Sequence, residues 1–103
     1  MLCYHFALAF SWVIAHYNIM NRKQERLLKA IFTNPVSASL SWPDIEALLV
    51  AIGCTVMEGN GSRVKFVCRK QVLAVHRPHP RKEAKAYQVR AVRDFLTNLG
   101  VTP

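Results

Sequence analysis

The spacing of apolar residues changes at Gly53, and this change constrains the fold more than any other feature of the chain. Before Gly53 apolar residues recur every three or four positions, whereas after it they alternate with polar residues. The first spacing is typical of a helix with one buried face, and the second is typical of a strand with one buried face. Because glycine readily adopts the left-handed conformation that closes a helix, we expect a helix to end here and a sheet to follow.

Two helices are predicted ahead of the sheet. The one that ends at Gly53 begins at Ser41, an expected N-cap, with Pro43 in the first turn and Asp44 as the acid of a capping box. Its apolar face consists of Ile45, Leu48, Leu49 and Ile52. An earlier helix is predicted at residues 22–32 and ends before Pro35. Its apolar face consists of Leu27, Leu28, Ile31 and Phe32.

Three short strands are predicted at residues 54–58, 63–68 and 71–76. The first turn is Gly59-Asn60-Gly61, whose residues tolerate positive φ, and the second turn is Arg69-Lys70. In the second strand the residues of one parity are apolar, and those of the other parity include two cations. The apolar set is Val64, Phe66 and Cys68, and the other set is Arg63, Lys65 and Val67. Because the apolar set needs the core, we expect Arg63 and Lys65 to share the solvent face.

A last helix is predicted from about residue 85 to residue 99, and Gly100 ends it. The order from Ser41 is therefore helix, three strands, helix. One face of the sheet must bury against both helices, which predicts an α+β fold like a double-stranded-RNA-binding domain: α-β-β-β-α, a three-stranded antiparallel sheet with helices on one face, plus an extra N-terminal helix. A chain of 103 residues supports one such core. We divide it into an extension at 1–19, a helix and linker at 20–40, and the domain at 41–103.

Residues 1–19 are apolar and carry no Asp, Glu, Lys or Arg. A signal peptide would begin with positive charge, and a membrane span would not be interrupted by His5, His16 and Asn18, so neither interpretation fits well. We interpret the segment as an upstream start ahead of Met20 or as a family-specific extension, and we expect no membrane association. Its aromatic side chains would pack on the domain or on a second copy of the chain, which leaves a homodimer open.

Positive charge is concentrated in the second half of the chain. The formal net charge is +8, and residues 63–93 contain ten basic residues against Glu83 alone. Such a segment can neutralise several phosphates at once, which favours RNA or another polyanion as the partner. A basic surface that serves only solubility is the alternative.

The cysteines argue against a disulfide scaffold and against a zinc site. There are three, Cys3, Cys54 and Cys68, without a Cys-x-x-Cys spacing. No pair of histidines has the spacing of metal ligands either. We therefore expect a cytoplasmic protein that needs no metal and no cofactor.

The region from Ser41 to Val101 resembles the HicA toxins, small ribonucleases of type II toxin–antitoxin systems. The resemblance rests on a helix that ends in Gly53, on Gly61-Ser62-x-x-x-Phe66, and on Pro78-His79-Pro80-x-Lys82-Glu83 before a helix that finishes in Leu99-Gly100-Val101. It implies an mRNA interferase with a double-stranded-RNA-binding-like fold, held inactive by a HicB-like antitoxin.

The chain departs from this family at one position. HicA toxins typically carry a catalytic histidine directly after the Gly-Ser pair, and this sequence has Arg63 there. Cleavage of RNA without a metal needs a group that takes and gives a proton near neutral pH. Because arginine stays protonated, it can bind phosphate or stabilise developing charge but cannot act as the base.

Two histidines of the resembling region could supply that group. His79 matches the Pro-His-Pro segment of the family and is our candidate catalytic residue beside Arg63, ahead of His76 at the end of the third strand. A structural or solvated role for His79 is the alternative. The residues expected to bind RNA are Gly61, Ser62, Arg63, Lys65, Arg77 and Lys82.

Three functions stay open at this point. The first is a metal-independent endoribonuclease. The second is a HicA-fold module that binds RNA without cutting it, and the third is an interaction protein whose basic face meets an acidic partner such as the antitoxin.

Overall fold

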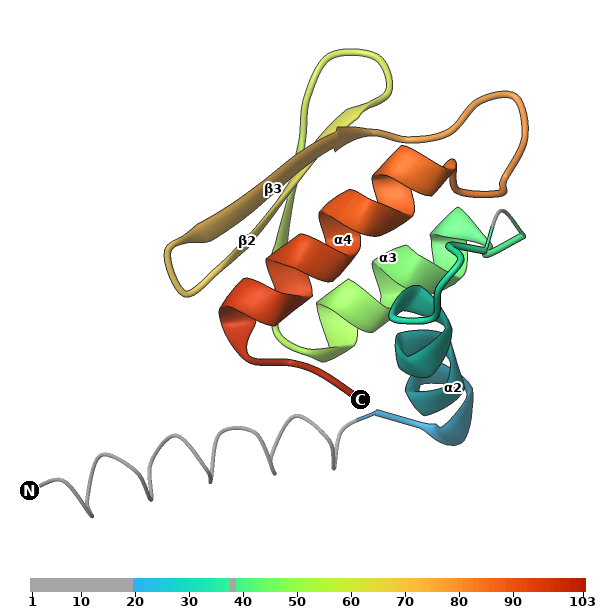
Figure 1. Ribbon diagram of the computed structural model, residues 1–103. Helices are drawn as coiled ribbons and strands as arrows, with labels where there is room; N and C mark the ends of the chain where they lie inside the picture. The colour runs from blue at the N-terminus through green and yellow to red at the C-terminus, as the bar shows by residue number, and fades with distance from the viewer. Residues whose placement is uncertain (1–19, 38) are drawn as a thin grey trace, which may run out of the picture.

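The computed structural model describes residues 20–37 and 39–103, and it confirms the predicted order of elements (Figure 1). The expectations for residues 1–19 lie outside the described residues. The elements are α2 (Arg22–Ile31), α3 (Trp42–Ala51), β1 (Thr55–Glu58), β2 (Arg63–Cys68), β3 (Gln71–His76) and α4 (Ala86–Leu99).

The strands form an antiparallel sheet in the order β1-β2-β3. Arg69 and Lys70 both have positive φ, 51° and 72°, as a two-residue hairpin turn between β2 and β3 requires. β1 begins one residue later than predicted because the backbone N–H of Cys54 donates to the Leu49 carbonyl of α3, at 3.0 Å. Gly53 has a φ of 105°, so it closes α3 as expected.

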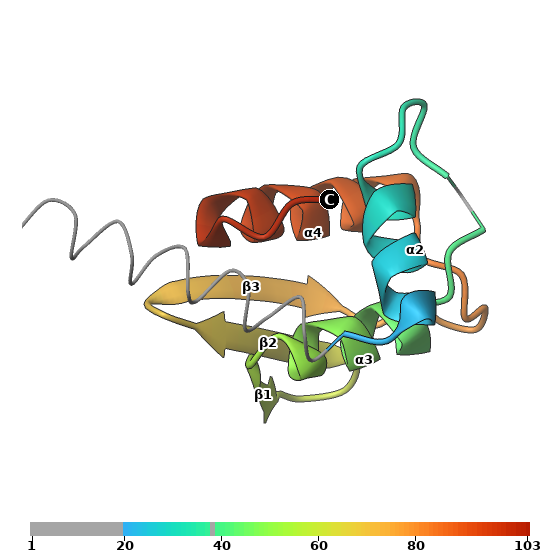
Figure 2. The same cartoon turned by 90° about the horizontal axis from the view of Figure 1, so that it is seen from below.

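Both α3 and α4 lie on one side of the sheet, and α2 contacts the two helices (Figures 1 and 2). Val64 and Phe66 of β2 and Leu73 of β3 point to this side and are buried. Helices α3 and α4 contribute the residues that cover them, among them Ile45, Leu48, Val92 and Leu96, all with no exposed surface. The other side of the sheet has no helix on it within the described part of the chain. We call it the open face.

The capping box predicted for α3 is wrong. Ser41 is the N-cap, but its side chain makes no capping hydrogen bond. The chain at Ser41 instead forms an isolated antiparallel bridge with Glu83, and the N–H of Trp42 donates to the Lys82 carbonyl at 2.8 Å. Asp44 pairs with Lys23 of α2, at 3.2 Å. The start of α3 is thus held by a distant segment and not by its own cap.

Helix α2 has the capping box that α3 lacks. The Asn21 side chain accepts from the N–H of Gln24 at 2.8 Å, and the Gln24 side chain accepts from the N–H of Asn21 at 3.1 Å. At the other end of α2, Arg93 of α4 donates to the carbonyls of Ile31 and Thr33, at 2.9 and 3.0 Å. Arg93 therefore serves to join two helices.

Among residues 20–37 and 39–103, no helix is both long enough and apolar enough to cross a membrane.

Candidate nucleic-acid interface

The register of β2 and β3 brings Arg63 opposite His76 and Lys65 opposite Ala74. Residues directly opposite each other in an antiparallel pair lie on the same face of the sheet. Val64 and Phe66 alternate with Arg63 and Lys65 along β2 and are buried on the helix side. Arg63 and Lys65 therefore lie on the open face. All four facing residues are exposed. The prediction that Arg63 and Lys65 share the solvent face is confirmed.

An open concavity on this face spans all three strands. Its lining includes Met57 of β1, Arg63 and Lys65 of β2, and Ala74 and His76 of β3. Two cations, an imidazole and an apolar floor are the groups that a polynucleotide needs for its phosphates and bases.

Ser62 and His76 contact each other at one end of the concavity. The Ser62 Oγ and the His76 Nδ1 lie 3.3 Å apart. The Ser62 carbonyl also accepts from the N–H of Arg77 at 2.8 Å, which continues the ladder one position beyond both strands. Gly61, with a φ of 63°, lies in the turn ahead of them and is exposed.

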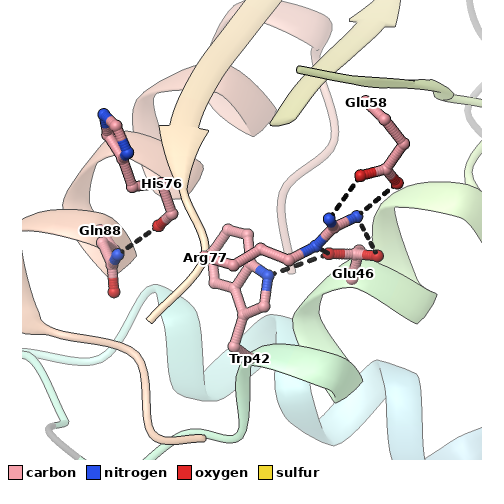
Figure 3. A network of polar contacts seen from close by, with 6 residues as sticks. All are labelled: Trp42, Glu46, Glu58, His76, Arg77 and Gln88. Carbon is pink, nitrogen blue, oxygen red and sulfur yellow. Dashed lines mark hydrogen bonds and ion pairs between the residues drawn. The ribbon is translucent and has the colours of Figure 1, made fainter. Parts of the chain in front are cut away.

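The backbone of His76 is held from the helix side by Gln88 of α4. The Gln88 Nε2 donates to the His76 carbonyl at 2.7 Å (Figure 3). The Gln88 Oε1 accepts from the N–H of Lys85 at 2.8 Å. Gln88 is the one buried polar side chain among the described residues, at 1% exposure. Sequence reasoning missed it, although a glutamine between buried positions of an amphipathic helix is a signal for such a buried bond.

Arg77 lies on the opposite side of the sheet from Arg63. It continues the parity of Leu73 and Val75, and its guanidinium lies between the carboxylates of Glu46 on α3 and Glu58 on β1 (Figure 3). The Nε donates to Glu46 at 2.8 Å, and the Nη1 and Nη2 donate to Glu58 at 2.6 and 2.8 Å. The Glu46 carboxylate also accepts from the indole N–H of Trp42, at 2.9 Å.

These hydrogen bonds favour the charged forms of Arg77 and Glu58, and they shift the pKa of each group accordingly. Hydrogen bonds from Arg77 lower the pKa of Glu58, and hydrogen bonds to Glu58 and then Glu46 raise the pKa of Arg77. The guanidinium that was expected to bind RNA is thus already occupied by two carboxylates.

His79 lies apart from Arg63. It is exposed in the loop after β3 and lines a second concavity that is formed by residues of this loop and the start of α4, including Pro78, Pro80 and Ala86. Lys82 is an exposed residue of the same loop, and its carbonyl is the partner of Trp42 described above. The structure therefore brings together Ser62, Arg63, Lys65 and His76, and leaves His79 and Lys82 in another part of the surface.

The pairing of Arg63 with His76 could have been found from the sequence. A two-residue turn at 69–70 pairs residue 68 with residue 71, and counting back along both strands pairs residue 63 with residue 76. Within the described ranges, no three His, Cys, Asp or Glu side chains gather as metal ligands would.

The fold and the open face define a class of protein: a small α+β domain with one helix-covered sheet face and one solvent-facing sheet face that carries cations. The chain belongs to a specific family of this class, because the family described as "HicA toxin of bacterial toxin-antitoxin" matches residues 42–101, from the start of α3 to just beyond α4. No curated protein and no solved structure matches the chain.

Proposed function

We propose that this toxin-family chain acts on RNA through its open face, as a metal-independent endoribonuclease of the mRNA interferase kind in the bacterial cytoplasm. The observation that carries the proposal is the grouping of Arg63, Lys65 and His76 on one exposed face of a HicA-family domain. Two cations can hold a phosphodiester, and a histidine can exchange a proton with it.

The remaining positive charge supports an RNA partner. Of the ten basic residues between positions 63 and 93, Arg77 and Arg93 are held by protein groups. Seven of the others are exposed and are our candidates for contacts with phosphates: Arg63, Lys65, Lys70, Arg81, Lys82, Lys85 and Arg90. We expect Gly61, Ser62, Arg63 and Lys65 to contact the RNA at the reacting phosphate, and Lys82 to contact the strand farther along.

We propose that Arg63 binds the reacting phosphate of the RNA. Its guanidinium can donate two parallel hydrogen bonds to the non-bridging oxygens and so stabilise the charge that develops on them. Proton transfer falls to a histidine, and the candidates among the described residues are His79 and His76, both exposed.

An antitoxin is the expected protein partner. Met57 and Val72 are 52% and 56% exposed on the open face, so a protein that covers this face would bury apolar as well as charged side chains. We infer that a HicB-like antitoxin covers this face and thereby excludes RNA. A HicB-like product of the neighbouring reading frame should therefore slow hydrogen exchange in β2 and β3 when it binds.

The test is an RNA binding and cleavage assay in EDTA. The wild type should cut an unstructured oligoribonucleotide, and its affinity should fall steeply with salt because bound cations displace counterions from phosphates. Arg63→Ala should lower the affinity and reduce the slope of log K against log salt by about 0.7 to 0.9. Arg26→Ala on α2 removes an exposed cation away from the sheet and is the matched control.

Two results would overturn the proposal. Affinity that does not change with salt would exclude phosphate binding. Salt-dependent binding without any cleavage would favour the second candidate function, an RNA-binding module, for which the observation is the arginine at position 63. In that case Arg63→His is expected to produce cleavage, because it supplies a titratable group beside the phosphate.

A further inference from the structure

We propose that His76, and not His79, is the catalytic histidine of this chain and works as a pair with Arg63 across the β2–β3 ladder. This inference rests on the proposed function, because it names the group that performs proton transfer in the same site. Three independent features of the structure support it: the type of cross-strand pair, the contact with Ser62, and the anchor from α4.

The pair of Arg63 and His76 is of the type in which side chains approach most closely. Arg77 donates its N–H to the Ser62 carbonyl, so residues 62 and 77 form a hydrogen-bonded pair. Pairs alternate along an antiparallel ladder, so the next pair, Arg63 and His76, is of the non-hydrogen-bonded type. The Cβ atoms of such pairs are about 4.5–5.5 Å apart. One phosphodiester can therefore contact both side chains.

The imidazole of His76 is oriented through one nitrogen. Its Nδ1 faces the Ser62 hydroxyl, and none of the described residues is bonded to its Nε2. The ring points away from the Arg77 carboxylate cluster (Figure 3). Because a hydroxyl can donate or accept, Ser62 can satisfy Nδ1 in either tautomer and leave Nε2 as a base or as an acid. This is the requirement for a group that first takes a proton and then returns it.

The backbone under His76 is fixed by Gln88. The carbonyl of His76 accepts from a side chain that is 1% exposed and is itself held by the N–H of Lys85. His79 has no such anchor among the bonds of the described residues, and it lines the separate concavity of its own loop. A catalytic group must be held in its productive geometry, which favours His76.

The step balances without a metal or any other cofactor. The His76 Nε2 takes the proton of the ribose 2′-hydroxyl, the 2′-oxygen forms a bond to phosphorus, and the bond from phosphorus to the 5′-oxygen breaks. Water protonates the leaving 5′-oxygen, and the hydroxide that remains takes the proton from the imidazolium. Arg63 and Lys65 neutralise the non-bridging oxygens throughout. The products are a 2′,3′-cyclic phosphate and a 5′-hydroxyl.

The first test compares matched histidine variants in the EDTA cleavage assay. His76→Ala should lower the single-turnover rate by about 10²-fold to 10⁴-fold and leave the RNA affinity within about threefold, the range expected for loss of one proton-transfer group. Free imidazole should restore part of this rate. His79→Ala is the control and should keep the wild-type rate within about threefold. A His76→Ala protein that cuts at the wild-type rate, or a His79→Ala protein that no longer cuts, would overturn the assignment.

The second test does not depend on cleavage. Binding of a 2′-O-methyl oligoribonucleotide, which has no 2′-hydroxyl proton to lose, should shift the imidazole NMR signals of His76 in the full chain more than those of His79. His76 signals that do not move on saturation would refute this proposal even if the wild type cuts RNA. If the His76 signals move but the wild type never cuts, the endoribonuclease function fails, and with it catalysis by His76.

Discussion

Replacing Arg77 with alanine tests whether this residue joins the elements of the fold or binds RNA. The side chain is 30% exposed and bridges a carboxylate of α3 to a carboxylate of β1. We expect Arg77→Ala to destabilise the folded protein and to leave its RNA affinity nearly unchanged at temperatures well below its Tm.

The magnitude follows from the Glu46 side of the bridge. Glu46 is 25% exposed and receives two bonds from Arg77, at 2.8 and 3.2 Å. Bonds between charged groups are worth about 1.5–3 kcal/mol each when well shielded, and partial exposure reduces this, so we expect a loss of about 2 kcal/mol. For a domain of this size that corresponds to a fall in Tm of roughly 10 °C. The Glu58 side is 63% exposed, so water screens it and it should add much less.

The assay is thermal and urea unfolding of three variants beside the wild type. Arg77→Ala should be the least stable, Arg77→Lys intermediate because it keeps the charge without the planar fork, and Glu58→Gln close to the wild type. Arg81→Ala removes an exposed cation from the same loop and is the control for charge alone. An Arg77→Ala protein with wild-type Tm and a strongly reduced RNA affinity would refute the bridging role.

The effect of Arg77→Ala should also depend on pH in a defined direction. Arg77 lowers the pKa of Glu58, so the charged form of this carboxyl group is more favourable in the folded state than in the unfolded state. The stability that this bond contributes is present above the ordinary pKa of a glutamate and is lost as the pH falls. The difference between wild type and Arg77→Ala should therefore narrow in acid, and a difference that widens in acid would contradict the assignment.

Two further predictions concern the core. Deleting residues 1–19 should leave a cooperative unfolding transition, because α3, the three-stranded sheet and α4 form a complete pair of layers around a buried apolar cluster, and a truncated protein with no transition would show otherwise. Burial, and then Cys68, raise the pKa of Cys54 to about 12, so the wild type should lose stability as the pH rises from about 9 to 12, and Cys54→Ala should lose less. An equal loss in both proteins would show that Cys54 is not the group responsible.

The sequence determined the elements and their order because these depend on local patterns. The helical spacing ahead of Gly53, the alternation in β2 and the two-residue turn at Arg69-Lys70 each indicate the conformation of a few neighbouring residues, and the structure agrees with each. The alternation of apolar and polar residues in β2 is also a local pattern, and it correctly predicted that Arg63 and Lys65 lie on the solvent-facing side.

Only the tertiary structure decided what those surfaces contain. Arg77 looked like one more cation of a basic segment, but its partners Glu46 and Glu58 lie 31 and 19 residues earlier, and they meet it only because the packing of the domain brings α3 and the end of β1 to the residue that follows β3. The start of α3 likewise depends on Lys82 and Glu83, which no local capping rule includes. The choice between His76 and His79 has the same origin: they are three positions apart in the chain, but one faces Arg63 across the β2–β3 ladder and the other lies in the loop that follows β3. Periodicity predicts which side of an element is buried, whereas the contacts between distant side chains depend on how the elements pack.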